Sequence, residues 1–100
     1  MYVITMEVDV SPDKAGAALA QLKKIVEHRK AKTGKDTRLL TRVTGVQGRV
    51  ILIADYESLE AWERARADNA VDAEWRTLFS DAAKEGLFAA PLNLTLWAEG

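Results

Sequence analysis

Val50-Ile51-Leu52-Ile53-Ala54 is a run of five apolar residues in the middle of the chain. Its length and its β-branched side chains predict a strand. Because alternate side chains of a strand point to opposite faces of the sheet, this strand is apolar on both faces. The helices of a small domain can cover one face only. We therefore expect the other face to be covered by the sheet of a second copy of the chain.

The segments before this run predict a strand, a helix and a second strand. Residues 2–10 alternate between apolar and polar side chains, as in a strand with one apolar face. Ser11 is the expected N-cap of a first helix, whose apolar stripe runs as far as the aliphatic stem of Arg29. Gly34 is the expected end of that helix. The second strand is expected at 37–46, followed by a short turn into the apolar run.

The segments after the run predict a broken helix and a last strand. Ser58 can cap this helix, and its apolar pattern weakens at 68–72 and resumes at Trp75. We therefore expect two helical pieces, followed by a strand at 92–99. The order strand, helix, strand, strand, helix, strand is that of a ferredoxin-like α+β fold, with both helices on one face of a four-stranded antiparallel sheet.

Alternation along the strands also assigns each side chain to a face of the sheet. With a two-residue turn, Val46 would pair with Arg49 and Arg42 with Ile53. The face away from the helices then mixes apolar and polar side chains. Its expected members are Val3, Thr5, Glu7, Arg38, Leu40, Arg42, Thr44, Ile51, Ile53, Asp55, Asn93, Thr95 and Trp97.

This mixture suits a sheet that packs on a partner sheet while its polar groups pair with one another. We expect Glu7 to form an ion pair with Arg42 or Arg38, within the chain or between subunits. The alternative is a solvated face that carries a few exposed aliphatic side chains. Basic residues also gather in 23–42, as a solvated helix face, an anion-binding corner or part of a subunit contact.

The composition excludes several classes of function. The 100 residues carry a net charge of −1, which gives no general attraction to nucleic acid or to an anionic membrane. The chain has no cysteine and one histidine, so we expect no thiolate nucleophile and no transition-metal site. Residues 1–10 do not resemble a signal peptide, and no apolar run approaches membrane-spanning length. We expect a single cytoplasmic domain over 1–100.

Three segments carry a family resemblance: SPDKAGAALAQL at 11–22, TRVTGVQGRVILIADYESLEAWERA at 41–65, and DAEWRTLFSDAAK at 72–84. In this pattern the chain resembles the dimeric α+β barrel superfamily, and most of all its NIPSNAP-type and antibiotic-biosynthesis-monooxygenase-type members. The resemblance implies a homodimer in which two sheets face each other and the helices lie outside. The superfamily includes cofactor-free monooxygenases, haem-degrading enzymes, small-lactone isomerases and domains with no assigned activity, so the fold does not settle function.

The branches of this superfamily make different demands on the sequence. The haem-degrading pattern needs an Asn on the first strand and a Trp–His arrangement on the second helix. Here the strand has Thr5-Met6-Glu7 and the helix has no His. The monooxygenase branch implies a pocket between sheet and helices, where Tyr56, Trp62, Asn69 and Trp75 could contribute. We expect no cofactor and no metal.

Glu7 is the best candidate for acid–base chemistry, because a central strand would partly remove its carboxylate from water. Arg42 is its expected partner at a catalytic site, and a purely structural ion pair is the alternative. A ligand pocket would be lined by Tyr56, Trp62 and Trp75, whose plain alternative is packing in the core.

Two further side chains complete the list of candidates. Arg38 could hold an anionic group of a ligand in that pocket. His28 lies off the apolar stripe of the first helix, so we expect it on the surface, facing solvent. Two functions remain open: a small-ligand-binding or structural dimer module, and a cofactor-independent monooxygenase or isomerase that acts on a small apolar or anionic metabolite.

Overall fold

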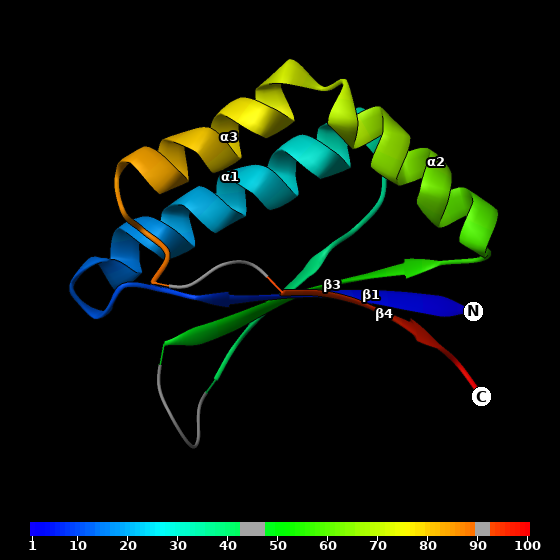
Figure 1. Ribbon diagram of the computed structural model, residues 1–100, viewed down its shortest axis with the longest axis horizontal. Coiled ribbons are helices and arrows are strands. Elements are labelled where there is room, and N and C mark those ends of the chain that lie inside the picture. The colour runs from blue at the N-terminus through cyan, green and yellow to red at the C-terminus, as the bar shows by residue number, and fades with distance from the viewer. Residues whose placement is uncertain (43–47, 90–92) are drawn as a thin grey trace.

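The computed structural model describes residues 1–42, 48–89 and 93–100. Its strands form one antiparallel sheet in the order β2-β3-β1-β4. All helices lie on one side of this sheet (Figure 1). The architecture confirms the predicted ferredoxin-like α+β fold. The strands are β1 (Tyr2–Asp9), β2 (Arg38–Thr41), β3 (Arg49–Tyr56) and β4 (Asn93–Ala98), and the helices are α1 (Ala15–Thr33), α2 (Leu59–Ala70) and α3 (Ala73–Lys84).

The first helix begins differently from the prediction. One turn of 3-10 helix, η1 (Pro12–Lys14), precedes α1, and the side chain of Ser11 does not cap either helix. Its hydroxyl instead donates to the carbonyl of Gly86 at 2.7 Å, which ties the start of the helix to the end of α3. The predicted helix end is confirmed. Gly34 has a left-handed φ of 74°, and its N–H donates to the carbonyl of Lys30.

The predicted break in the second helical segment is confirmed at Val71 and Asp72. Ser58 caps α2, because its hydroxyl accepts a hydrogen bond from the N–H of Ala61 at 3.1 Å. Asp72 caps α3 in the same way, with one carboxylate oxygen accepting from the N–H groups of Glu74 and Trp75. Ser58 and Asp72 each start a helix of their own. The segment 59–84 therefore forms two short helices instead of one long helix.

The predicted register between β2 and β3 is wrong by four residues, whereas the predicted faces are correct. Ile53 pairs with Arg38, not with Arg42. Arg42 lies opposite Arg49, to whose carbonyl its N–H donates, so the connection is longer than a two-residue turn. An even shift keeps every side chain on the same face. Of the other predicted positions, Val46 and Thr44 lie outside the described residues.

The core lies between the sheet and the helices. Val8, Leu22 and Ile25 are its largest fully buried side chains, one from β1 and two from α1. A second group of buried residues, Ile4, Ala54 and Tyr56, lies nearer to α2. In the described parts of the chain, no helix is both long enough and apolar enough to cross a membrane.

Candidate functional site

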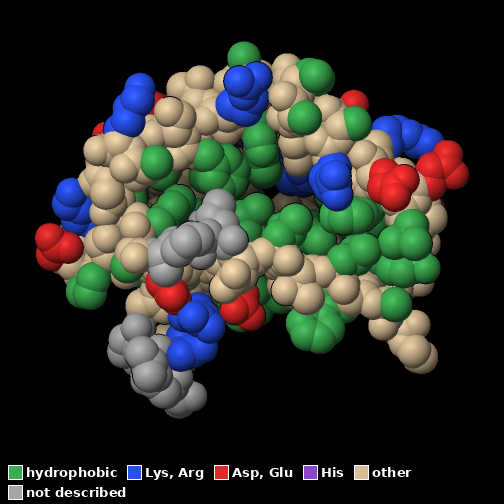
Figure 2. Space-filling view, in the orientation of Figure 1, with side chains coloured by type: hydrophobic (Ala, Val, Ile, Leu, Met, Phe, Trp, Pro, Cys, Tyr) green, Lys and Arg blue, Asp and Glu red, His purple; other side chains and the backbone are tan. Residues whose placement is uncertain are grey.

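A cavity of about 220 Å³ separates part of the helix layer from the sheet. Figure 2 shows this region as a hollow with hydrophobic side chains around it and Lys or Arg side chains beside it. Side chains from the sheet and from all three helices line the cavity, as does Thr37, which precedes β2. They are Ile4, Met6, Ile25, Val26, Arg29, Thr37, Leu52, Ala54, Tyr56, Trp62, Arg66, Asn69, Trp75, Phe79 and Leu94.

The local sequence explains why space remains at this place. Ala54 lines the cavity between Leu52 and Tyr56 on the same face of β3, and its small side chain leaves space there. The break after α2 makes the roof from two short helices instead of one. Trp62 comes from α2 and Trp75 from α3, so each short helix contributes one large aromatic wall.

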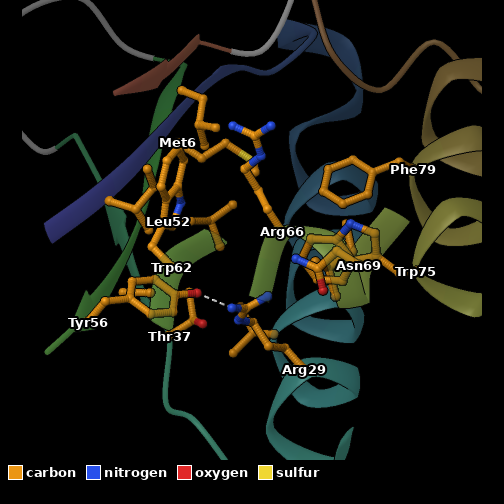
Figure 3. A pocket seen from close by; sticks show the side chains of 15 residues that line it. Met6, Arg29, Thr37, Leu52, Tyr56, Trp62, Arg66, Asn69, Trp75 and Phe79 are labelled. Carbon is orange, nitrogen blue, oxygen red and sulfur yellow. Dashed lines mark hydrogen bonds between the residues drawn. The ribbon is translucent and has the colours of Figure 1, made fainter. Parts of the chain in front are cut away.

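Arg29 is the most unusual residue of the lining. It is only 7% exposed, and one of its guanidinium N–H groups donates to the hydroxyl of Tyr56 (Figure 3). Its guanidinium carbon lies 5.9 Å from the centre of the Tyr56 ring and 5.6 Å from that of Trp75. No acidic side chain of the described residues pairs with it, and the undescribed segments 43–47 and 90–92 contain no Asp or Glu. The chain therefore offers this buried cation no carboxylate partner.

Two polar atoms at the cavity are buried without a hydrogen-bond partner among the described residues. One is Nε of Arg29 and the other is Oγ1 of Thr37. Buried polar groups are nearly always hydrogen-bonded, because a buried group without a partner costs about 1–3 kcal/mol. Because Arg29 and Thr37 both line the cavity, these two atoms mark the polar end of its lining.

Tyr56 also keeps a donor for a ligand. Its hydroxyl oxygen accepts from Arg29, so the phenolic proton remains free to donate. Burial raises the pKa of Tyr56, and the charge and hydrogen bond of Arg29 oppose that rise. The phenol is therefore protonated at neutral pH. Nζ of Lys35 also lies near the ring of Tyr56, 4.3 Å from its centre.

Comparison with known proteins gives neighbours in structure alone. No protein-family model and no curated protein matches the sequence. An uncharacterized NIPSNAP domain protein from Burkholderia xenovorans is 14% identical and has a TM-score of 0.78, with 100% of this chain and 95% of that chain covered. A NIPSNAP family protein from Agrobacterium tumefaciens is 15% identical and has a TM-score of 0.80, with 99% and 92% covered. An antibiotic biosynthesis monooxygenase is 12% identical and has a TM-score of 0.75, with 100% and 99% covered.

The chain has the ferredoxin-like fold of NIPSNAP and antibiotic biosynthesis monooxygenase domains. At these identities the likeness shows the fold and not the chemistry. The structural neighbours match the superfamily that the sequence pattern resembled.

In this ferredoxin-like domain the predicted site residues fall into two separate groups. Tyr56, Trp62 and Trp75 all line the cavity. Arg38 does not, because it is exposed on β2 and shares the outer face of the sheet with Ile53. The structure thus brings the aromatic candidates together and leaves the predicted anion-binding arginine on the other side.

The two candidates for catalysis also lie away from the cavity. Glu7 is on the outer face of β1, so the sheet separates it from Trp62. Within the chain Glu7 forms its ion pair with Arg49, at 3.3 Å, instead of with Arg42 or Arg38. A pair with either of these arginines between subunits stays a prediction. Arg49 also contacts Asp9 at 2.8 Å, and this contact lowers the pKa of the Asp9 carboxyl.

The prediction that His28 faces solvent is wrong. Its side chain is 11% exposed, with Nε2 2.8 Å from Asp72 and Nδ1 3.2 Å from Glu74. Both acids belong to the start of α3, so the histidine joins α1 to α3. No group of three or more acidic, His or Cys side chains in the described residues is placed to hold a metal ion.

Sequence reasoning missed the buried polar residues of the cavity, above all Arg29. The signal was present, because Arg29 continues the apolar stripe that Leu22 and Ile25 begin on α1. A charged residue at a core position of a helix needs a partner, and none of the nearby sequence supplies an obvious one. Thr37 carried no signal, since a threonine before a strand is common on protein surfaces.

Proposed function

We propose that this domain is a small-ligand-binding module whose ligand occupies the cavity between the sheet and the helices. The observation that carries the proposal is the lining itself. Aromatic and aliphatic side chains form most of the wall, and a few polar groups converge on it from Arg29, Thr37 and Tyr56. This combination is characteristic of small-molecule sites. A structural core would have filled the space or paired the polar atoms.

The proposal includes a homodimer formed through the outer face of the sheet. On that face Leu40 is 47% exposed and Trp97 is 55% exposed, and Ile51 and Ile53 are half-buried. Exposed apolar side chains grouped on one face and mixed with polar pairs are typical of a protein interface. A second sheet of the same kind would cover them, and the cavity would remain on the helix side of each subunit.

A cofactor-independent monooxygenase or isomerase is the second candidate. One structural neighbour is an antibiotic biosynthesis monooxygenase, and the Arg29–Tyr56 pair supports the same idea in this chain. A cation and a phenol in an apolar pocket can stabilise negative charge that develops on a substrate oxygen. No base for proton abstraction lines the cavity among the described residues, so the binding module remains the first choice. The cytoplasmic location expected from the sequence stays part of the proposal.

A thermal-shift screen with single-ring and short-chain molecules of each charge tests the proposal. Ala54→Leu fills the floor of the cavity, and Ala67→Leu adds the same atoms to an exposed position on α2. We expect a ligand to raise the Tm of the wild type and of Ala67→Leu but not of Ala54→Leu. Equal stabilisation of both variants, or no hit at all, would refute a ligand site in this cavity. Oxygen consumption in the presence of a hit would favour the monooxygenase.

A further inference from the structure

We infer that the ligand is a small monocarboxylate with an apolar body, and that Arg29 receives its carboxylate. This inference rests on the proposed function and adds the chemical class of the ligand. It is drawn from the charge that the cavity buries, the donors that it leaves unused and the space that it offers.

The charge of Arg29 calls for an anion. Removing a guanidinium from water costs several kcal/mol even after a protein relaxes around it. The two aromatic rings near Arg29 offset part of this cost, and the neutral phenol of Tyr56 contributes one hydrogen bond. Part of the desolvation cost of the Arg29 guanidinium therefore remains, and a single negative charge beside the guanidinium would offset it. Arg66 also lines the cavity but is exposed and lies over the ring of Trp62, so it adds no second buried charge.

The unused donors select a carboxylate among possible anions. Nε of Arg29 and the hydroxyl of Thr37 are buried donors that no described residue pairs with, and the phenolic proton of Tyr56 lies beside them. A ligand would reach the two buried donors after a small rotation of these side chains toward the cavity. A carboxylate is an acceptor at both oxygens and carries no proton that would need an acceptor in return. Its planar geometry also matches the guanidinium edge. Figure 3 shows Arg29, Thr37 and Tyr56 at the same end of the lining.

The rest of the cavity selects the body of the ligand. Met6, Leu52, Trp75 and Phe79 offer no charge and few hydrogen-bonding groups. The volume of about 220 Å³ exceeds the roughly 150 Å³ of an engineered protein cavity that binds benzene. A single substituted ring or a short hydrocarbon chain therefore fits, and a multi-ring molecule would need the helices to move.

The experiment compares matched acids and amides by calorimetric titration at neutral pH. The probes are 4-methylbenzoate against 4-methylbenzamide and hexanoate against hexanamide, with acetate as the acid that lacks a body. We expect each acid to bind at least about tenfold more tightly than its amide and than acetate. Thr37→Val keeps the shape and the buried charge, and we expect it to weaken acid binding several-fold without changing amide binding.

Arg29→Gln supplies the decisive variant, with Arg64→Gln as its control. Arg64 is an exposed arginine of α2 whose partner is Glu60. We expect the preference for acids to vanish in Arg29→Gln and to persist in Arg64→Gln. If Arg29→Gln does not fold, the Thr37→Val comparison still decides. Equal binding of acids and amides by the wild type would overturn the carboxylate inference and leave the ligand site standing. Binding of neither would overturn both.

Discussion

Nε2 of His28 lies 2.8 Å from Oδ2 of Asp72, and the other ring nitrogen lies 3.2 Å from a carboxylate oxygen of Glu74. The imidazole joins α1 to the first turn of α3 through two acidic side chains. Asp72 has a second role at the same place, because its other oxygen caps α3.

Acid should weaken this contact through Asp72. The hydrogen bond from His28 is the main cause that lowers the pKa of Asp72 in the folded chain, and the backbone bond from Trp75 adds to it. A lowered folded pKa means stability that is full above the unfolded value of about 3.9 and lost as pH falls through the folded value. We expect unfolding midpoints in urea to fall between about pH 5 and pH 3 more steeply in the wild type than in Asp72→Asn.

The asparagine variant is the appropriate comparison because it keeps the cap of α3. It removes the charge alone, so its free energy of unfolding should be lower than that of the wild type at pH 7 and closer to it at pH 3. Parallel pH profiles for the two proteins would show that the His28–Asp72 contact carries no charge-dependent stability.

Leu40→Glu should dissociate the proposed dimer. Leu40 is 47% exposed on the outer face of the sheet, and a carboxylate there would lose its water in a sheet-to-sheet interface. We expect a weakening of self-association by at least about tenfold in sedimentation velocity. Leu59→Glu is the control, because Leu59 is 43% exposed on α2, on the helix side. A monomeric wild type at micromolar concentration would contradict the dimer.

Ser58→Ala should destabilise the domain by about 1 kcal/mol, because it removes the side-chain cap of α2. Ser80→Ala is the matched control at an exposed position inside α3, where alanine is the better helix former. We expect the control to leave stability unchanged or to raise it by less than about 0.5 kcal/mol. Chemical denaturation measures both. Equal losses would mean that the Ser58 cap contributes nothing.

Two glycine substitutions, one within α1 and one at its C-terminal cap, should act in opposite directions. Gly34 has a φ of 74°, so Gly34→Ala should cost about 1 kcal/mol even though an added Cβ meets no neighbour. Gly16 lies in ordinary helix with open space around it, so Gly16→Ala should stabilise by about 0.5 kcal/mol. Chemical denaturation of the two variants measures the difference between their free energies of unfolding. A stabilising Gly34→Ala would show that the helix end adopts another conformation.

Local rules predicted most of the fold. Alternation placed Ile53 and Arg38 on one face of the sheet and Leu52 on the other, and the weakening of the apolar pattern at 68–72 predicted the break that the structure shows at Asp72. The register failed because it depends on how many residues the turn contains, and an apolar pattern repeats every two residues without marking which repeat pairs with which. The alternation of apolar and polar residues therefore cannot distinguish the predicted register from one that is shifted by four residues.

The site was predicted in its aromatic part and in Asn69, which also lines the cavity, because residues on an inner helix face tend to gather in any case. The polar part depends on contacts between distant segments. His28 is 44 residues from Asp72, and Arg29 is 27 residues from Tyr56. Nothing in the sequence near either residue indicates such a partner. The position of Arg29 on the buried stripe was the one usable sign, and an aliphatic stem alone explained it equally well.

His28 and Arg29 are consecutive residues of α1, yet one contacts the start of α3 and the other borders the cavity. Successive residues of a helix are rotated by about 100° around its axis. A single residue inserted earlier in α1 would therefore swing both side chains away from their neighbours together. Any length change that evolution tolerates in this helix must fall outside the span that carries the pair, so natural insertions and deletions should cluster after residue 33 or before residue 15.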